Sequence, residues 1–506
     1  GYAAEDLLLR PAFMDACDDA LKTVARELAG LKGLHVVVGH PDGGGIQSRS
    51  VSVSKRFNRA SVLCEGQVVA SYAKQELPNY QVFDERRYFT PGSESCVFEL
   101  SGVKMGLLIC EDAWFEKPAQ KAREAGAQLL LVLNASPFHV GKGLEREVQM
   151  GQRVQNCGLP LVYAHLVGGQ DEVIFEGRSF ALNAKADVVA RAPAFQECMP
   201  TITVDSTAVE GQLNITGTLA SGGGSWQEDL WHALVLGIRD YLGKNGFPGA
   251  LLGLSGGIDS ALVLALAVDA LGADKIHAVM MPSQYTADIS WIDSREMVKR
   301  LGVRYDEIAI APLFEGFKLA LADQFKGLAE DTTEENIQAR VRGTLLMAMS
   351  NKTGAIVLTT GNKSEMATGY CTLYGDMAGG FAVIKDVVKT QVFQLAEWRN
   401  HNDPYGTGEN PIPERIITRP PSAELRADQK DQDSLPPYEV LDAIVQRYME
   451  NDEGIQALVA DGFDQADVEK VTRLIKLNEY KRRQSPVGIR VTHRSFGKDW
   501  RYPITN

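Results

Sequence analysis

The sequence predicts two α/β domains, an α-β-β-α sandwich over residues 1–216 and a doubly wound parallel sheet over residues 226–506. Strand-like runs joined by hairpin signals dominate the first part, whereas strands alternate with helices in the second. Residues 217–225 between them read Gly-Thr-Leu-Ala-Ser-Gly-Gly-Gly-Ser, a composition typical of a flexible linker. A length of 506 residues fits more than one domain at about 150 residues each.

The composition disfavours several classes of protein. The 52 basic and 65 acidic residues give a net charge of −13, which argues against a nucleic-acid or anionic-membrane partner. The longest apolar runs fall well short of the roughly 18 residues that a transmembrane helix needs. Seven cysteines without a C-x-x-C spacing indicate reduced thiols, a cytoplasmic location and no structural zinc site.

In the first domain, alternating apolar residues and Gly-containing turns predict strands and hairpins, and helical periodicity appears at 119–125 and 144–155. This mixture predicts largely antiparallel sheets. The expected strands cover residues 35–38, 51–54, 60–63, 68–72, 97–100, 104–109, 128–133 and 159–165.

In the second domain, the strand–helix alternation predicts a parallel sheet with helices on both faces, whose ligand crevice lies at the carboxyl ends of the strands. The Pro- and Asp-rich segment 411–437 is expected to be a long loop that closes over this crevice. The expected strands cover residues 250–254, 275–281, 304–308 and 355–360. One expected helix ends at residue 271, and two others cover residues 290–301 and 334–350.

A glycine-rich loop joins the first strand and helix of the second domain. The segment reads Gly253-Leu-Ser-Gly-Gly-Ile-Asp-Ser260, and its glycines let backbone N–H groups approach a phosphate at the helix N-terminus. Unlike the loop of ordinary nucleotide triphosphatases, it supplies an Asp rather than a Lys, and Asp259 is suited to hold a divalent cation.

A second motif, Thr359-Thr-Gly-Asn-Lys-Ser-Glu-Met-Ala-Thr-Gly-Tyr370, also follows a strand. Thr360 is expected to reach the nucleotide, and Glu365 to share Mg²⁺ with Asp259, because this ion prefers one or two carboxylates plus phosphate oxygens. Taken alone, Glu365 and Lys389 would be ordinary solvated helix residues.

These motifs, together with Tyr374-Gly-Asp-Met-Ala-Gly-Gly, Pro421-Ser-Ala-Glu-Leu and the tail Tyr480-Lys-Arg-Arg-Gln-Ser-Pro, resemble the NAD⁺ synthetases over most of residues 226–506. The resemblance implies that Asn336, Arg340, Glu365 and Lys481 bind deamido-NAD⁺. It implies that ATP is bound by Gly253, Leu254, Ser255, Gly256, Gly257, Ile258, Asp259, Ser260, Thr360, Lys389 and Ser422.

In the first domain, Cys110 ends an apolar strand and is followed by two acids and a Trp. A lone buried cysteine is more often structural than reactive. Lys74, just after another strand, and the segment Asn134-Ala-Ser-Pro-Phe-His-Val-Gly-Lys142 strengthen the functional interpretation.

Together these segments resemble the nitrilase superfamily, which cleaves amides with a Glu-Lys-Cys triad. The resemblance covers about residues 1–205 and is closest to the glutaminase domain fused to NAD⁺ synthetase. It implies that Cys110 attacks the amide of glutamine, that Lys74 stabilises the oxyanion, and that Tyr80, Ser136 and Lys142 bind glutamine.

The third triad member departs from the pattern. The family's general-base Glu precedes the Gly-Tyr run with which this sequence begins, so we expect it upstream of Gly1, and Glu5 is not assigned to this role. Glu85 matches a second glutamate that positions the site, with a surface ion pair to Arg86 or Arg87 as the alternative.

The combined interpretation is a homo-oligomeric ligase that amidates deamido-NAD⁺ with MgATP, using ammonia from glutamine. Three alternatives remain. They are another ATP-pyrophosphatase amidotransferase such as a GMP or asparagine synthetase, an ammonia-dependent synthetase with an inactive first domain, and a non-catalytic scaffold that senses nucleotides. The nitrilase-type domain and the tail at Lys481 disfavour the first of these.

Overall fold

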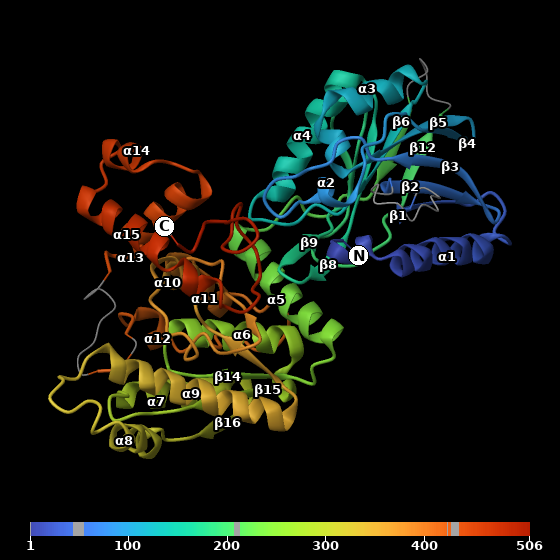
Figure 1. The fold of residues 1–506 in the computed structure, drawn as a ribbon. Helices are drawn as coiled ribbons and strands as arrows, with labels where there is room; N and C mark the ends of the chain where they lie inside the picture. Colours follow the sequence, from blue (N-terminus) through green and yellow to red (C-terminus); the bar gives the residue numbers. More distant parts are fainter. Residues whose placement is uncertain (1, 44–54, 207–212, 423, 427–434, 506) are drawn as a thin grey trace. The chain divides into compact units, whose positions relative to one another are not determined.

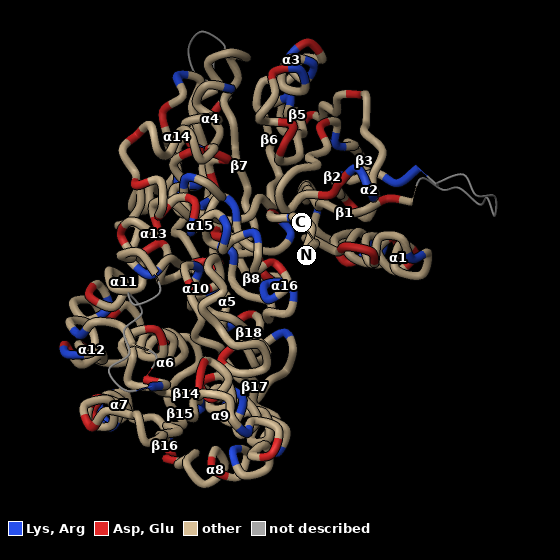
Figure 2. The backbone as a smooth tube through the Cα atoms, turned by 60° about the vertical axis from the view of Figure 1, so that its left-hand side comes forward, with Lys and Arg blue, Asp and Glu red and all other residues tan. Residues whose placement is uncertain are grey.

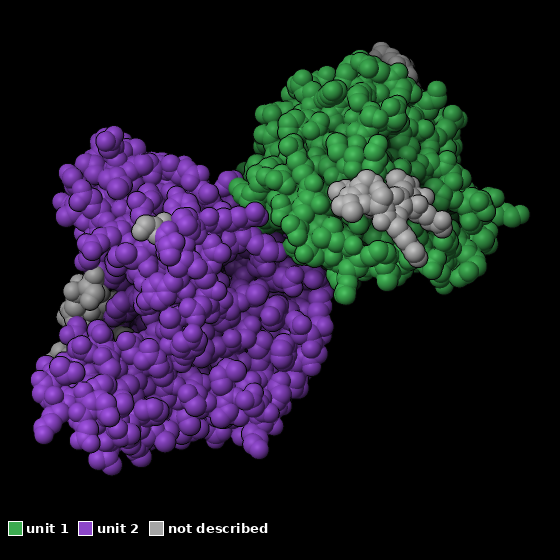
Figure 3. All heavy atoms as spheres, in the orientation of Figure 1, with its two compact units in different colours: residues 1–168, 175–224 green, residues 169–174, 225–506 purple. Residues whose placement is uncertain are grey.

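The structure, a computed structural model, describes residues 2–43, 55–206, 213–422, 424–426 and 435–505. The chain forms two compact units (Figures 1 and 3), one of residues 1–168 and 175–224 and one of residues 169–174 and 225–506. The passage from residue 224 to 225 falls inside the predicted linker. In the described residues, no helix is both long and apolar enough to cross a membrane.

The first unit is built from short strands and a few helices. Its helical segments are η1 (Glu5–Leu9), α1 (Pro11–Leu28), α2 (Glu85–Tyr88), η2 (Cys110–Trp114), α3 (Glu116–Glu124) and α4 (Lys142–Cys157). Its strands are β1 (His35–Asp42), β2 (Phe57–Cys64), β3 (Gln67–Ala73), β4 (Val97–Leu100), β5 (Val103–Ile109), β6 (Leu129–Asn134), β7 (Leu161–His165), β8 (Val167–Gln170), β9 (Val173–Glu176), β10 (Phe180–Leu182), β11 (Val188–Arg191), β12 (Ile202–Asp205) and β13 (Asn214–Gly217).

Two sheets pack face to face in this unit. The antiparallel sheet β1-β2-β3 contacts the six-stranded sheet β11-β10-β7-β6-β5-β4 through β2 and β5. Helix α1 packs on β1 to β3, while α3 and α4 pack on the larger sheet, which completes the predicted α-β-β-α order. Most strand pairs are antiparallel as expected, but the central strands β5, β6 and β7 run parallel. The carboxyl ends of these strands therefore meet at one edge.

The second unit alternates strands and helices and ends in a helical cluster. Its strands are β14 (Ala250–Gly253), β15 (Ile276–Met280), β16 (Arg304–Glu307), β17 (Ile356–Thr359) and β18 (Phe381–Ala382). Its helical segments are α5 (Trp226–Asn245), α6 (Ile258–Leu271), η4 (Ala273–Lys275), α7 (Asp288–Leu301), α8 (Ala311–Ala320), α9 (Thr332–Thr353), α10 (Lys363–Thr368), α11 (Lys389–His401), α12 (Glu414–Thr418), α13 (Tyr438–Val445), η6 (Gln446–Glu450), α14 (Ile455–Ala460), α15 (Gln465–Leu477) and α16 (Glu479–Arg482).

All five strands of this sheet are parallel, in the order β16-β15-β14-β17-β18. Helix α6 is buried along almost its whole length and contacts β14 and β15, while α9 contacts β14 and β17. The first strand, β14, lies between β15 and β17, so the strand order reverses beside it. Doubly wound sheets bind ligands at such a switch point, outside the carboxyl ends of the strands.

The structure corrects or extends several sequence predictions. The segment 411–437 is not a continuous loop, because residues Glu414–Thr418 form α12 and bury Ile416. The predicted strand 51–54 lies outside the described residues. Helices α1, α5 and α13 to α16 were not predicted. Acidic and basic residues are interspersed along the backbone of both units (Figure 2).

Candidate active sites

Cys110 lies at the carboxyl end of β5, where the chain turns into a short 3-10 helix. Its φ of 47° is in the left-handed region, which a non-glycine residue rarely adopts without a functional reason. The buried carboxylate of Asp112 fixes this turn. It accepts hydrogen bonds from the backbone N–H groups of Ile109, Gln75 and Glu76 at 3.1, 3.0 and 2.8 Å and from the Tyr72 hydroxyl at 2.9 Å.

Lys74, at the end of β3, lies buried beside the thiol. Its Nζ donates to both carboxylate oxygens of Glu85 at 2.8 Å, and both side chains are at most 5% exposed. The alternative of a surface ion pair between Glu85 and Arg86 or Arg87 is therefore wrong. Burial raises the pKa of the Cys110 thiol to about 11, and the Lys74 ammonium opposes this shift. The cation thus favours the thiolate that nucleophilic attack requires.

Two of the predicted glutamine ligands lie near the thiol. The Tyr80 hydroxyl donates to Oε1 of Glu111 at 2.9 Å, and Nζ of Lys142 lies 3.1 Å from Glu145 and 4.3 Å from the centre of the Trp114 ring. Both side chains interact electrostatically with the thiol group. Burial lowers the pKa of Lys142, as expected for a cation partly removed from water.

The third predicted ligand, Ser136, contacts a buried ion pair. Arg146 of α4 donates to the carbonyl oxygen of Ser136 at 2.7 Å and to its Oγ at 3.3 Å, and it pairs with Glu176. His165 adds a contact of 3.0 Å to the same carbonyl oxygen. Sequence reasoning missed Arg146 and Glu176, because neither stands in a motif segment that carries the chemistry.

In the second unit, the glycine-rich loop has the geometry that its sequence predicts. Gly256 has a φ of +81°, and a Cβ there would lie 2.7 Å from the carbonyl oxygen of Ser290, so the position requires glycine. Ser255 Oγ accepts from the N–H of Gly257 at 3.2 Å, and Ser260 Oγ donates to the Gly257 carbonyl at 2.9 Å. The loop is thus fixed by its own hydroxyls.

A pocket opens above this loop at the carboxyl ends of β14, β15 and β17. Of the predicted ATP ligands, Gly256 does not line it. Those that do are Gly253, Leu254, Ser255, Gly257, Ile258, Asp259, Ser260, Thr360, Lys389 and Ser422.

The two predicted magnesium ligands meet at one residue. Asn362 donates its Nδ2 to Oδ1 of Asp259 at 2.9 Å and its backbone N–H to Oε2 of Glu365 at 3.1 Å, and both carboxylates line the pocket. No group of three or more His, Cys, Asp or Glu side chains suited to a metal occurs among the described residues. Two carboxylates in a pocket beside a glycine-rich loop fit Mg²⁺, an ion that commonly combines one or two carboxylates with phosphate oxygens and water.

Three of the predicted deamido-NAD⁺ ligands converge on segment 369–373. Asn336 accepts from the Thr372 hydroxyl at 2.7 Å, and Arg340 donates to the carbonyl oxygen of Leu373 at 3.2 Å. Lys481 donates to the carbonyl oxygens of residues 369 and 371 at 2.7 and 2.8 Å. The fourth, Glu365, lines the ATP pocket instead.

Two pocket residues were not predicted. Arg342 donates its Nε to the carbonyl of Met281 at 2.9 Å, and burial lowers its pKa to about 10. Asp376 accepts from the N–H of Thr372 at 2.6 Å. Withdrawal from water raises the pKa of its carboxyl to about 6, and the Lys481 ammonium opposes this shift. Asp376 belongs to the run Tyr374-Gly-Asp, whose similarity to the NAD⁺ synthetases was the sequence signal that could have identified it.

Comparisons with known proteins agree with this arrangement. Residues 10–211 match the carbon-nitrogen hydrolase family, and residues 230–485 match the NAD synthase family. A glutamine-dependent NAD(+) synthetase from Xanthomonas campestris is 48% identical, over 100% of this chain and 89% of the relative. One from Thermotoga maritima is 41% identical, over 100% and 91%. The chain belongs to the glutamine-dependent NAD(+) synthetase family.

Solved structures of glutamine-dependent NAD(+) synthetases share the fold. That from Acinetobacter baumannii, solved in complex with adenosine diphosphate, is 44% identical with a TM-score of 0.76, covering 100% of this chain and 90% of that one. The structure from Cytophaga hutchinsonii has the same fold at 22% identity, with a TM-score of 0.79 and the same coverage. The family's two enzymatic domains, a carbon-nitrogen hydrolase and an ATP-using NAD synthase, thus correspond to the two units that carry Cys110 and the glycine-rich loop.

Proposed function

We propose that this chain converts deamido-NAD⁺ to NAD⁺ with MgATP, using ammonia released from glutamine at Cys110. The observation that carries this proposal is the convergence of Asp259 and Glu365 on Asn362 inside a pocket that follows a phosphate-binding loop. A carboxylate is a poor electrophile. Adenylation of the nicotinate carboxylate gives a mixed anhydride with AMP as leaving group, which ammonia can displace.

In the first unit, the Cys110 sulfur would attack the amide carbon of glutamine. A tetrahedral intermediate forms, and its oxyanion is stabilised by the buried Lys74 ammonium. It collapses to a thioester as the C–N bond breaks, and the leaving nitrogen takes up the thiol proton to become ammonia. Water then hydrolyses the thioester to glutamate and regenerates the Cys110 thiol. Glu85 keeps this ammonium oriented through both of its oxygens. The nitrilase resemblance also implies a general-base Glu, and we assign no described residue to that step.

In the second unit, the backbone of the glycine-rich loop would hold the phosphates of ATP. Asp259 and Glu365 would hold Mg²⁺, which neutralises phosphate charge when it is bound. Lys389 and Arg342 would add positive charge around the departing pyrophosphate. Asn336, Arg340 and Lys481 would orient deamido-NAD⁺ through segment 369–373.

The test is an assay of AMP and NAD⁺ formation with either glutamine or ammonia as nitrogen donor. We expect both products with deamido-NAD⁺ and none with xanthosine monophosphate. Asp259→Asn should lose synthesis with both donors. Activity with xanthosine monophosphate alone, or unchanged synthesis by Asp259→Asn, would contradict the proposal.

The oligomeric state and the cellular location of the protein are further parts of this proposal. A homo-oligomer is expected from the resemblance, and light scattering of the purified chain measures its mass directly. A cytoplasmic location is supported by the seven unpaired cysteines.

A further inference from the structure

Lys389, the first residue of α11, directs its ammonium to the carboxylate that we assign to magnesium. Its Nζ donates to Oδ2 of Asp259, which lies in the first turn of α6. The lysine side chain is 2% exposed and that of Asp259 is 16% exposed, and the Tyr438 ring centre lies 5.5 Å from Nζ. The ammonium therefore neutralises Asp259 in an environment largely withdrawn from water.

The second oxygen of Asp259 also has a protein donor. Nδ2 of Asn362 lies 2.9 Å from Oδ1, so both carboxylate oxygens accept from the protein. A magnesium ion on either oxygen would lie within a few ångströms of the Lys389 ammonium. Two positive charges this close repel strongly where solvent screening is weak. Metal and ammonium are thus in competition for Asp259.

The backbone on either side of this contact is anchored. The N–H of Lys389 donates to Ser364 Oγ at 2.9 Å, the N–H of Thr390 donates to Asp442 at 2.8 Å, and the Ser364 hydroxyl also donates to Asp442. These bonds fix the start of α11 against α10, so an exchange of partners needs only rotation about the side-chain bonds of Lys389.

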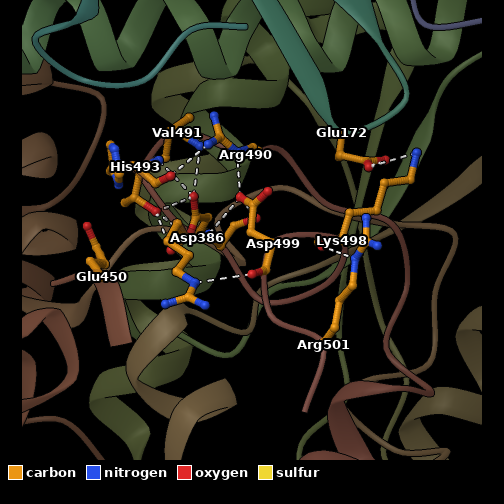
Figure 4. A network of polar contacts seen from close by, with 12 residues as sticks. Glu172, Asp386, Glu450, Arg490, Val491, His493, Lys498, Asp499 and Arg501 are labelled. Carbon is orange, nitrogen blue, oxygen red and sulfur yellow. Dashed lines mark hydrogen bonds and ion pairs between the residues drawn. The ribbon is translucent and has the colours of Figure 1, made fainter. Parts of the chain in front are cut away.

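The start of α10, which carries Asn362, is anchored in the same way. Nζ of Lys363 lies 3.0 Å from Asp386 and 2.6 Å from Glu450. Asp386 in turn accepts from the backbone N–H of Val491, within the polar network shown in Figure 4. Asp259 is therefore held by a rigid amide on one oxygen and by a long, rotatable side chain on the other.

We propose that Lys389 is a placeholder cation, which neutralises Asp259 until MgATP binds and then exchanges to the triphosphate while magnesium takes over the carboxylate. This inference rests on the proposed function, since it uses the magnesium and ATP roles assigned above. It predicts that removing the lysine strengthens metal binding by the nucleotide-free protein, although the same lysine is needed for turnover.

The experiment measures Mn²⁺ binding to the full chain without nucleotide, with electron paramagnetic resonance reporting the unbound ion. We expect Lys389→Met to bind Mn²⁺ about tenfold more tightly than the unaltered chain, a difference of about 1.4 kcal/mol. Lys389→Met combined with Asp259→Asn should lose this gain. Lys22→Met, which removes an ammonium 3.0 Å from the exposed Asp19, is the charge-matched control and should change nothing.

Thermal unfolding gives a second readout that does not depend on turnover. Because a ligand that binds the folded state stabilises it more when it binds more tightly, Mg²⁺ should raise the Tm of Lys389→Met by more than that of the unaltered chain. Lys389→Gln serves in the same measurements if the Met variant does not fold. Unchanged or weaker metal binding by the variant would overturn the inference.

The two proposals fail in different ways. If the unaltered chain forms no AMP from deamido-NAD⁺ and MgATP, the proposed function is wrong. If it turns over normally and Lys389→Met shows no gain in metal affinity, the proposed function stands and the placeholder role is wrong.

Discussion

Lys74 and Lys389 are both buried against a carboxylate, but the group beside each pair gives the two lysines different tasks. Lys74 pairs with Glu85 next to the Cys110 thiol, so it supplies a fixed positive charge where an oxyanion would form. Lys389 pairs with Asp259, a carboxylate suited to bind a metal, so its pair has to break during the reaction. The Lys74–Glu85 ion pair is thus expected to persist through the reaction, whereas the Lys389–Asp259 pair is expected to exchange partners.

Replacing Lys74 by Met tests the first of these tasks. The pKa of Cys110, already raised to about 11 by burial, should rise further because the opposing ammonium is gone. Less thiolate is then present at any given pH, by roughly tenfold per unit of pKa. The pH dependence of Cys110 alkylation by iodoacetamide, followed by mass spectrometry, measures this change. Equal rates in both proteins across the pH range would contradict the assignment.

The same variant needs a stability control, because Lys74→Met leaves Glu85 charged and buried. Loss of one partner of a buried pair costs about 3–5 kcal/mol. The double variant Lys74→Met, Glu85→Gln should regain most of the stability. It should regain only part of the thiol reactivity, because removing the Glu85 carboxylate lowers the pKa of Cys110 but does not replace the Lys74 cation. Full recovery of the alkylation rate in the double variant would show that the effect is structural.

Asp376 gives a pH prediction for the second unit. Withdrawal from water raises the pKa of its carboxyl to about 6, so the carboxyl is mostly ionised well above pH 6 and mostly protonated well below it. Protonation weakens its bond to the N–H of Thr372 and its attraction to Lys481, and so loosens the segment on which the proposed deamido-NAD⁺ ligands converge. The KM for deamido-NAD⁺ should therefore rise as the pH falls below 6.

Steady-state kinetics of Asp376→Asn, with ammonia as donor, test whether this residue causes the rise in KM for deamido-NAD⁺ at low pH. The variant should have a raised KM at pH 7.5 and no further increase between pH 7 and 5.5. Asp15→Asn, an exposed position in α1, is the matched control and should keep the dependence of the unaltered chain. A KM for Asp376→Asn that still rises below pH 6 would assign the titration to another group.

At the scale of elements, the turn between β14 and α6 carries a strong sequence constraint. Gly256→Ala places a methyl group 2.7–2.8 Å from backbone and side-chain atoms of Ser290 at a positive φ, so the loop has to move. A strained residue of this kind costs about 1–3 kcal/mol. We expect a lower Tm and a KM for ATP raised about tenfold or more.

Gly243→Ala is the control for this change. Gly243 lies inside α5, and nothing within 4 Å would contact the added methyl group. Because alanine has the higher helix propensity, this variant should be neutral or more stable by up to about 1 kcal/mol. Thermal unfolding and ATP titration of both variants make the comparison. Equal behaviour of the two would show that the loop tolerates a side chain.

The elements that the sequence predicted well are those with strong local signals. The strands from β2 to β7 and from β14 to β17 combine apolar runs with turn residues, and each was predicted within a few positions. Helix α12 was missed because five residues between prolines give no helical period. The terminal helices α13 to α16 were missed because their buried positions form a core with distant residues such as Met366 and Trp500.

At the candidate sites, the residues that belong to sequence motifs were predicted and those outside motifs were not. Cys110, Lys74 and the loop at 253–260 stand in motifs, and the structure gathers them into two sites. Arg146 and Arg342 act on backbone carbonyls of Ser136 and Met281, contacts that leave no pattern in the sequence. The alternative for Glu85 could not be decided before folding, because Lys74 and Glu85 become partners only when β3 and α2 meet.

At the scale of the whole molecule, one chain carries two chemistries in two compact units. The chain crosses between them more than once, since residues 169–174 of the β8–β9 hairpin belong to the second unit. The Gly169 N–H donates to Asp240 of α5 at 2.7 Å, and the N–H of Arg490 donates to the Glu172 carbonyl at 2.7 Å. The hairpin is therefore part of the second unit's hydrogen-bonding scheme although its flanks belong to the first.

Because of this division, we expect a single substitution in one unit to remove one activity and leave the other. Cys110→Ala removes the nucleophile and should abolish glutamine-dependent NAD⁺ formation, while ammonia-dependent formation continues at the unaltered rate, because the ATP pocket is lined wholly by residues 253–425. Cys157→Ala, a second buried cysteine of the same unit, controls for cavity formation and should retain both activities. NAD⁺ production with each donor is measured for the three proteins. Loss of ammonia-dependent synthesis in Cys110→Ala but not in Cys157→Ala would mean that the thiol also supports the synthetase site, and the two units could not then be treated as independent catalysts.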